Sequence, residues 1–282
     1  MEVRIIDNWT AKASEILKTA IARATDVRTA VAFVSKEGID TLWPALTAAA
    51  DRGAWLEFLV GLDGQSTEPQ AVSSLLSLTN RSERASLWGW DATSRGATFH
   101  PKLYIARAAN QSTCLIGSSN LTKGGLRDNV EVNVLCRGAE DDEIVSQAYE
   151  TYLRIKQAGH ARLVDAEVLG RYEELWHIAA EMREKQRASP AYSTAEKRFR
   201  EAVRRRPRVK VERKDLYGWL DLVYDVLPEG EFTNQQVYRH REIFQRRFPR
   251  NRNIEAKIRQ KLQELRDLGL IEHLGPGRWR KL

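Results

Sequence analysis

His100-Pro-Lys102, followed by Gly117-Ser-Ser-Asn120 and then by Glu131, is the stretch that decides which fold we expect. The histidine and the lysine stand two residues apart at the head of residues 102–106, an apolar run typical of a β-strand. Side chains two apart leave the same face of a strand, so an imidazole and an ammonium group would point at one anion. The proline between them lacks an amide N–H, which the first residue of a strand can spare. We therefore expect this strand to begin at an anion-binding site.

Two further segments would place polar groups at the same site. Residues 113–116 form a second apolar run that ends in the Gly117-Ser-Ser-Asn120 turn, whose glycine, hydroxyls and amide can wrap closely around a phosphate. Residues 129–136 alternate as a strand does and carry Glu131 on one face. A glutamate there can accept a hydrogen bond from imidazole Nδ1–H and fix the tautomer. Together the three segments would supply a nucleophile, oxyanion donors and an orienting carboxylate.

This pattern resembles the signature of the phospholipase D superfamily, a His-x-Lys followed by a Gly-Ser-x-(x)-Asn turn. The resemblance covers roughly the first two thirds of the chain. It implies an α/β fold with a mixed sheet flanked by helices, and phosphodiester cleavage through a covalent phosphohistidine without a metal or any other cofactor. His100 would then attack phosphorus, while Lys102, Ser118 and Asn120 would hold the non-bridging oxygens of the transition state.

The chain departs from the family at Arg107, which stands where the family often has an aspartate. We assign that role to Glu131, as a glutamate has it in the nuclease branch; the lipid-cleaving branch fits less well. The family's chemistry also uses two histidines, one as nucleophile and one as acid for the leaving oxygen. This chain has five histidines but a single His-x-Lys. We therefore expect a homodimer with a composite site.

Periodicity and composition describe the rest of the first 186 residues. Helical patterns alternate with apolar strand-like runs, which predicts an α/β domain over residues 1–186. Cys114 and Cys136 lie in apolar runs, and two cysteines are too few for a disulfide framework or a four-ligand zinc site. Residues 1–7 do not resemble a signal peptide, and no apolar run approaches the ~20 residues of a membrane span. We expect a cytoplasmic protein that makes no membrane contact.

Charge is divided unevenly along the chain. Residues 196–282 hold 23 of the 45 Lys and Arg residues but only 13 of the 38 Asp and Glu residues, so residues 1–195 carry a small net negative charge. Residues 187–214 contain Arg204-Arg-Arg-Pro-Arg208 and are expected to be a basic linker. A basic C-terminal part favours a polyanion partner, because phosphate neutralisation with counterion release supplies much of nucleic-acid affinity.

The C-terminal pattern predicts a winged-helix domain over residues 215–282. Residues 216–227 have helical spacing, Phe232 and Thr233 would begin a second helix with Thr233 as N-cap, and an apolar stripe over residues 254–265 predicts a third helix that Gly269 ends. Residues 270–280 read as a β-hairpin, the wing. Residues 258–271 with the Gly-Pro-Gly-Arg-Trp that follows resemble the C-terminal DNA-binding domain of adenine-methylation-dependent restriction endonucleases.

A recognition helix inserts its N-terminal part into the major groove, where Arg, Asn, Gln and Lys can contact base edges. On this basis the candidate DNA-binding residues are Arg250, Asn251, Arg252, Asn253, Lys257 and Gln260, with Arg278 in the wing.

The sequence therefore predicts a metal-independent DNA endonuclease, expected to be a restriction enzyme acting on double-stranded DNA as a homodimer. The second resemblance makes methylated DNA an expected substrate. One alternative is a catalytically silent DNA-binding regulator, which the intact set of His100, Lys102, Asn120 and Glu131 disfavours. Another is a phospholipid phosphodiesterase, disfavoured because no apolar membrane-binding segment occurs and the basic tail has a nucleic-acid-binding pattern.

Overall fold

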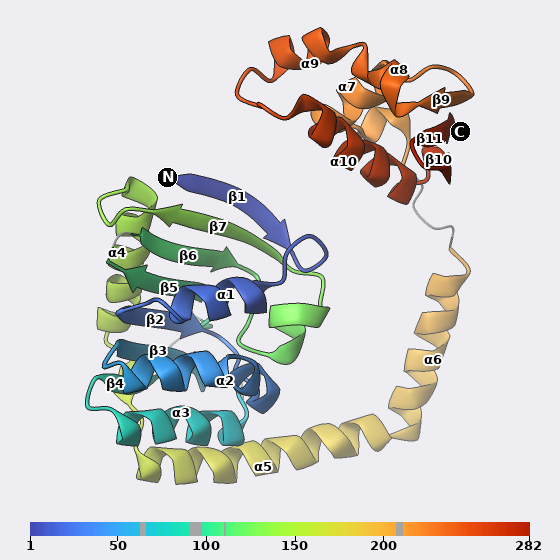
Figure 1. Ribbon diagram of the computed structural model, residues 1–282. Coiled ribbons are helices and arrows are strands. Elements are labelled where there is room, and N and C mark those ends of the chain that lie inside the picture. Colours follow the sequence, from blue (N-terminus) through green and yellow to red (C-terminus); the bar gives the residue numbers. More distant parts are fainter. Residues whose placement is uncertain (63–65, 91–97, 110, 207–210) are drawn as a thin grey trace. The chain divides into compact units, whose positions relative to one another are not determined.

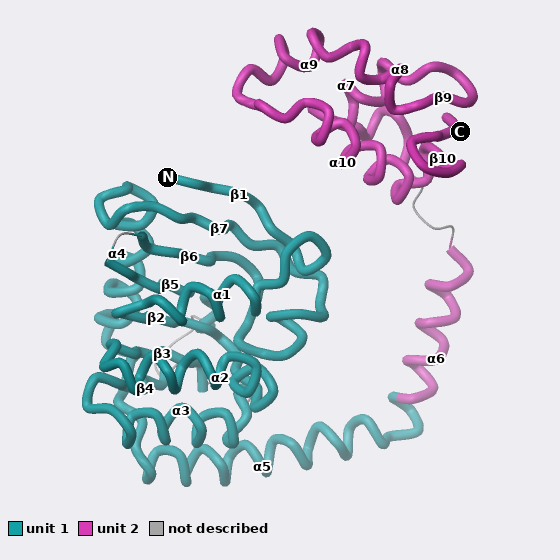
Figure 2. Tube along the Cα trace, viewed as in Figure 1, with its two compact units in different colours: residues 1–192 teal, residues 193–282 magenta. Residues whose placement is uncertain are grey.

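The computed structural model describes residues 1–62, 66–90, 98–109, 111–206 and 211–282 (Figure 1). These residues form two compact units, Met1–Tyr192 and Ser193–Leu282 (Figure 2). The predicted basic linker, residues 187–214, includes the division between them, and helix α6 (Pro190–Arg204) occupies much of it.

The first unit is built on a mixed sheet. Its strands in the described residues follow the order β1-β7-β6-β5-β2-β3-β4-β8. Parallel pairing joins β2 to β3 and β3 to β4, while the other neighbours are antiparallel. The strands are β1 (Glu2–Asp7), β2 (Asp26–Val31), β3 (Trp55–Gly61), β4 (Ala85–Trp90), β5 (Lys102–Ala108), β6 (Gln111–Gly117), β7 (Val132–Gly138) and β8 (Ala161–Leu163).

Helices cover both faces of this sheet, as the alternation of strand residues requires. On β5, Tyr104 and Ala106 join the core beneath α1 (Ala13–Ile21) and α2 (Lys36–Asp51), whereas Leu103 and Ile105 join a second core beneath α4 (Glu143–Gln157). Figure 1 shows α1, α2 and α3 (Pro69–Arg81) over one face and α4 over the other. Helix α5 (Ala166–Ala188) packs beside α3. The predicted α/β fold with a mixed, helix-flanked sheet is confirmed.

Three elements of this unit were not predicted, and the strand predicted over residues 129–136 begins three residues later, as β7. Strands β1 and β8 and the π-helical turn η1 (Gly124–Asp128) have no counterpart in the periodicity. Glu131 precedes β7 instead of lying within it, because the ladder with β1 starts at the Asp7–Val132 pair.

The second unit has the predicted winged-helix elements. Ile254, Ile258, Leu262 and Leu265 form the buried stripe of α10 (Ile254–Asp267), and Gly269 follows the helix with a φ of 75°. The Thr233 amide donates to Gln236 Oε1 at 2.8 Å, as an N-cap residue in a capping box does.

One detail of this unit differs from the prediction. Phe232 does not begin a helix, because it pairs with Trp279 in a small sheet ordered β10-β11-β9. The elements are α7 (Trp219–Asp225), β9 (Glu231–Thr233), α8 (Asn234–Tyr238), α9 (Arg241–Arg247), β10 (Ile271–Gly275) and β11 (Arg278–Lys281), preceded by the 3₁₀ turn η2 (Arg213–Asp215).

Across the described parts of both units, no helix is both long and apolar enough to span a lipid bilayer.

Candidate active site

Sheet topology brings the predicted catalytic segments to one end of the large sheet. Strand β5 is antiparallel to β6, and β6 is antiparallel to β7, so the start of β5, the end of β6 and the start of β7 coincide. The end of β2 joins them, because Val31 pairs with Lys102. Residues distant in sequence therefore meet where four neighbouring strands begin or end.

His100 stands just before β5 with an exposed side chain. Its ring lies edge-on to the ring of Phe33, with 5.8 Å between centroids. The ring nitrogens have no hydrogen-bond partner within the described part of the chain, so both are available to substrate. The backbone carbonyl of His100 accepts a hydrogen bond from Lys102 Nζ at 2.9 Å.

Lys102 is a buried cation, with only 7% of its surface exposed. Among the residues that the structure describes, it forms no ion pair; its ammonium group lies 5.8 Å from the centre of the Phe33 ring. Burial lowers the pKa of Lys102, and the negative charge of Glu131 opposes this shift in part. A desolvated ammonium group without a carboxylate partner is a strong site for an incoming anion.

The Gly117-Ser-Ser-Asn120 turn is held rigidly beside these groups. A Cβ on Gly117 would lie 2.3 Å from the Val132 carbonyl oxygen, so only glycine fits. Ser119 is fully buried: its amide donates to Asn133 Oδ1 at 3.2 Å, and its hydroxyl oxygen accepts from Asn133 Nδ2 at 2.8 Å. The Tyr104 hydroxyl donates to the Ser119 carbonyl at 3.0 Å. Strands β5 and β7 thus fix the turn from two sides.

Asn120 is oriented as a donor. Its Oδ1 accepts the Phe33 amide at 3.1 Å, which leaves both Nδ2 hydrogens for another acceptor. Phe33 therefore contacts three of the predicted catalytic residues, His100, Lys102 and Asn120.

Glu131 is buried and engaged with neighbours other than the predicted one. Its carboxylate accepts from Ser118 Oγ and, at 3.4 Å, from Asn129 Nδ2. Ser118 Oγ also accepts the Val132 amide at 3.0 Å. In the described residues Glu131 has no hydrogen bond with His100; Ser118 and Asn129 bind its carboxylate instead. The expected direct contact that would fix the imidazole tautomer is absent from this single chain.

A groove of about 430 Å³ leads away from His100 and Lys102. One wall is the end of the sheet, with Leu103 and Ile116, and the other is α4, with Ile144 and Ile155. The site is therefore open to a large substrate on one side.

Sequence reasoning missed Phe33, Tyr104, Ser119 and Asn133. Tyr104 had a detectable signal, because it stands two residues after Lys102 and so shares its face of the strand. Phe33 looked like any apolar residue at the end of a strand.

The predicted DNA-binding residues of the second unit fall into two groups. Arg250, Asn251, Arg252 and Asn253 occupy the turn before α10. Within that turn Asn251 Oδ1 accepts the Asn253 amide at 2.8 Å.

The remaining three lie on regular elements. Lys257 donates to Gln260 at 2.9 Å on α10, and burial, with repulsion from Lys261, lowers the pKa of Lys257. Arg278 lies on β11 and pairs with Glu231 at 3.3 Å, so part of its charge is already neutralised.

Two family models match this chain, one in each of its two compact units. Residues 17–155 match the family model of the cardiolipin synthase, PLD-like domain, and residues 215–281 match that of the Dam-replacing HTH domain.

Solved structures give more distant likenesses. A phospholipase D family member, Nuc, from Salmonella typhimurium is 20% identical, with a TM-score of 0.46 over 58% of this chain and 99% of its own. NucT from Helicobacter pylori is 16% identical, with a TM-score of 0.44 over 58% of this chain and 99% of its own. Phosphatidylserine synthase from Haemophilus influenzae Rd KW20 is 14% identical, with a TM-score of 0.43 over 65% of this chain and 47% of its own.

The two family matches, together with the sheet topology and the winged helix, show that this chain joins a phospholipase D-like domain to a C-terminal Dam-replacing helix-turn-helix domain.

Proposed function

We propose that this protein is a metal-independent DNA endonuclease, of the restriction type, that cleaves phosphodiesters through a phosphohistidine at His100. The observation that carries the proposal is Lys102, a buried cation without a carboxylate partner among the described residues, next to an exposed imidazole with free ring nitrogens. A phosphodiester supplies both the missing anion and the electrophile. The helix-turn-helix domain supports DNA as the molecule that carries it.

In the first chemical step a ring nitrogen of His100 forms a bond to phosphorus, and the bond from phosphorus to the leaving oxygen breaks. Lys102 and the Nδ2 group of Asn120 stabilise the charge that develops on the non-bridging oxygens. A buried ammonium group is effective here because attraction between charges strengthens as the local dielectric falls. In the second step water displaces His100 from phosphorus, which restores the histidine and leaves a phosphate monoester.

Glu131 acts through its neighbours in this scheme. It holds Ser118 and the start of β7 in place, and its charge favours the protonated form of Lys102. We therefore assign Ser118 a positioning role, since its hydroxyl proton is already donated to Glu131, and assign the direct contact with phosphate oxygen to Asn120 and Lys102.

The leaving oxygen needs a proton, and the proposed donor is His100 of a second copy of the chain. Support comes from an apolar sheet face beside the site, formed by Ile5, Ile116, Val132 and Val134. Ile5 pairs with Val134, and Val134 with Ile116, so these side chains lie in one row across β1, β7 and β6. Ile5 is 74% exposed and Val132 is 57% exposed. Contiguous exposed apolar surface of this kind is typical of an interface.

The test is cleavage of plasmid DNA in EDTA. Wild-type protein is expected to cut, His100→Ala to bind DNA without cutting, and His177→Ala, which changes an exposed histidine on α5, to cut normally. Activity that disappears in EDTA and returns with Mg²⁺ contradicts the mechanism. Wild-type protein that binds but never cuts would identify a regulator instead. Parallel assays on adenine-methylated and unmethylated plasmid show whether methylation is required.

A further inference from the structure

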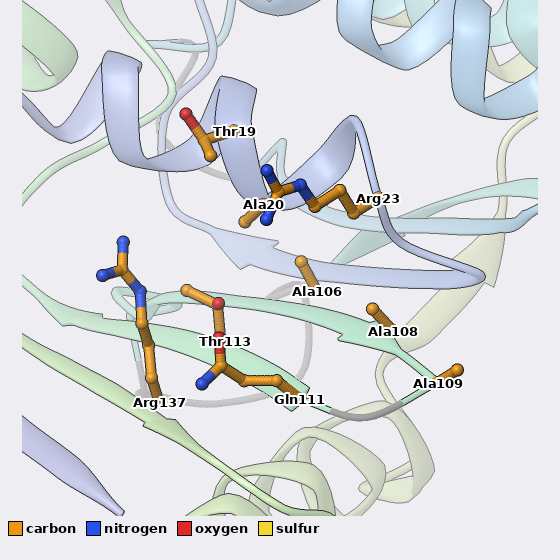
Figure 3. Close-up of a pocket in the computed structure, with 9 residues that line it drawn as sticks. All are labelled: Thr19, Ala20, Arg23, Ala106, Ala108, Ala109, Gln111, Thr113 and Arg137. Carbon is orange, nitrogen blue, oxygen red and sulfur yellow. The ribbon is translucent and has the colours of Figure 1, made fainter.

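A second hollow opens on the opposite half of the catalytic domain. It lies over β5 and β6 beside α1 (Figure 3) and has a volume of about 500 Å³. Its lining residues on β5 are toward the end of the strand remote from Lys102. Ala108 is six residues along β5 from Lys102, or roughly 20 Å at the rise of a strand. The hollow is therefore separate from the groove beside His100, with which it shares no residue.

Small residues create the hollow. Ala106 and Ala108 alternate onto the α1 face of β5, and Ala20 faces them from the helix. A larger side chain at these positions would fill the hollow. Tyr104, two residues before Ala106 on the same face of β5, is such a side chain.

The polar groups around this floor suit an anion. Arg23 and Arg137 line the hollow from α1's C-terminal side and from β7, and both guanidinium groups are directed toward the space above the strands (Figure 3). Gln111 and Thr113 of β6 add an amide and a hydroxyl. Among the lining residues none is acidic. Guanidinium groups donate in a planar fork that matches two oxygens of a phosphate.

The charge around the hollow is not balanced by nearby acids. Glu2 lies 3.5 Å from Arg137 and 3.4 Å from Arg4, so a single carboxylate serves two arginines. Arg23 is exposed and forms no ion pair with any residue that the structure describes. Two arginines without an acidic lining residue stand out here because residues 1–195 carry more acidic than basic side chains.

We infer that the hollow between Arg23 and Arg137 binds a phosphate group, either of the DNA backbone at a distance from the scissile bond or of a free nucleotide. The assignment to a DNA backbone phosphate rests on the proposed function, whereas the assignment to a free phosphate does not. In both cases Arg23 contributes the fork that lacks a partner, and Gln111 and Thr113 complete the hydrogen bonds.

The experiment uses full-length His100→Ala protein, so that no substrate is cut. Arg23→Ala is compared with Arg171→Ala, which removes an exposed arginine from α5. Affinity for a short duplex is measured against salt concentration, and binding of dAMP and of inorganic phosphate is measured by calorimetry. Circular dichroism checks that each variant is folded.

If the DNA backbone is the ligand, Arg23→Ala should flatten the salt slope by about 0.9 for the one lost contact, while Arg171→Ala leaves it unchanged. If a free phosphate is the ligand, Arg23→Ala should weaken dAMP or inorganic phosphate about tenfold or more, with the duplex slope unchanged. A variant that alters neither the slope nor phosphate binding overturns the proposal. None of these readouts depends on cleavage, so failure of the nuclease function is detected separately.

Discussion

Lys102 shows how the site is arranged at the scale of one residue. Its ammonium group is buried, and the described residues around it offer a carbonyl oxygen and an aromatic ring in place of a carboxylate. A charge in such surroundings costs stability in the free protein, and on the proposed mechanism a bound phosphodiester would remove that cost. Function and stability are therefore opposed at this position.

Lys102→Met should abolish cleavage while raising the free energy of unfolding by about 1 kcal/mol, or Tm by ~2–4 °C. The gain has a defined pH dependence, because burial places the Lys102 pKa in the folded protein below its usual value of 10.5. The cost of the charge is complete below the folded-state pKa and declines as pH rises from there toward 10.5. The difference in the free energy of unfolding between Lys102→Met and wild type should become smaller over that pH range. Thermal unfolding at a series of pH values measures it, with exposed Lys185→Met as control. A less stable Lys102→Met at neutral pH contradicts this account.

Ser118 and Asn120 differ although both belong to one turn. The Ser118 hydroxyl is used by Glu131 and by the Val132 amide, whereas Asn120 presents two unused hydrogens. Asn120→Ala should therefore lower single-turnover cleavage roughly 10²–10³-fold, the usual effect of one oxyanion donor. Ser118→Ala should cost about tenfold or less, as expected for a residue that acts through a neighbour. Equal losses in the two variants would show that Ser118 contacts the phosphate directly.

At the scale of elements, the Asn133 side chain connects β7 to the turn, in addition to the hydrogen bonds between Ser118 and Val132. Asn133 offers both its amide oxygen and its amide nitrogen to Ser119, and Tyr104 fixes the same residue from β5. These hydrogen bonds are buried, so removing either side chain leaves an unsatisfied polar group, which costs about 1–3 kcal/mol of stability.

Asn133→Ala should lower kcat at temperatures far below its Tm, with KM nearly unchanged, because the turn loses its alignment while DNA affinity lies mainly elsewhere. Ser112→Ala removes a buried hydroxyl at the far end of β6 and serves as the control, with kcat unaffected. If both variants change only thermal stability, Asn133 has no positioning role.

Elements with a strong period could be predicted from the sequence. The strand at residues 102–106, the turn after β6 and the α10 stripe each carry a local pattern that the structure confirms. Strand β1 was missed because its apolar alternation is short: only Val3 and Ile5 carry it, both are exposed, and Ile6 alone among the residues of the strand is buried. Strand β8 has only three residues, too few for a period.

The gaps in the predicted site have a similar cause. Phe33 acquires its role only when the fold brings its ring to His100 and its amide to Asn120, 87 residues away. Glu131 has a different hydrogen-bond partner from the predicted one, since alternation indicates a face of a strand and does not indicate which neighbouring side chain binds the carboxylate. Contacts of this kind depend on tertiary geometry.

At the scale of the whole molecule, charge and chemistry are assigned to different parts of the chain. Residues 196–282 hold about half of the basic residues and a third of the acidic ones, while the first unit holds the candidate catalytic groups. The first unit also exposes the apolar sheet face next to His100. On the proposed mechanism, a single histidine nucleophile beside an exposed apolar surface is what a composite site shared by two copies of the chain would require.

Mixed dimers test this composite site directly. When wild-type chains are co-folded with His100→Ala chains, a shared centre loses its nucleophile or its acid in every mixed dimer, so activity should fall as the square of the wild-type fraction. At equal amounts about a quarter of the activity should remain, against about half if each chain cuts alone. Co-folding with His177→Ala chains, which keep His100, should cause no loss.

Val132→Asp, which places a charge on the apolar sheet face, should yield monomers without cleavage but with the fold intact, as seen by sedimentation and circular dichroism. A linear fall in the mixing series, or active Val132→Asp monomers, would mean that one His100 suffices and that the acid for the leaving oxygen comes from within the same chain.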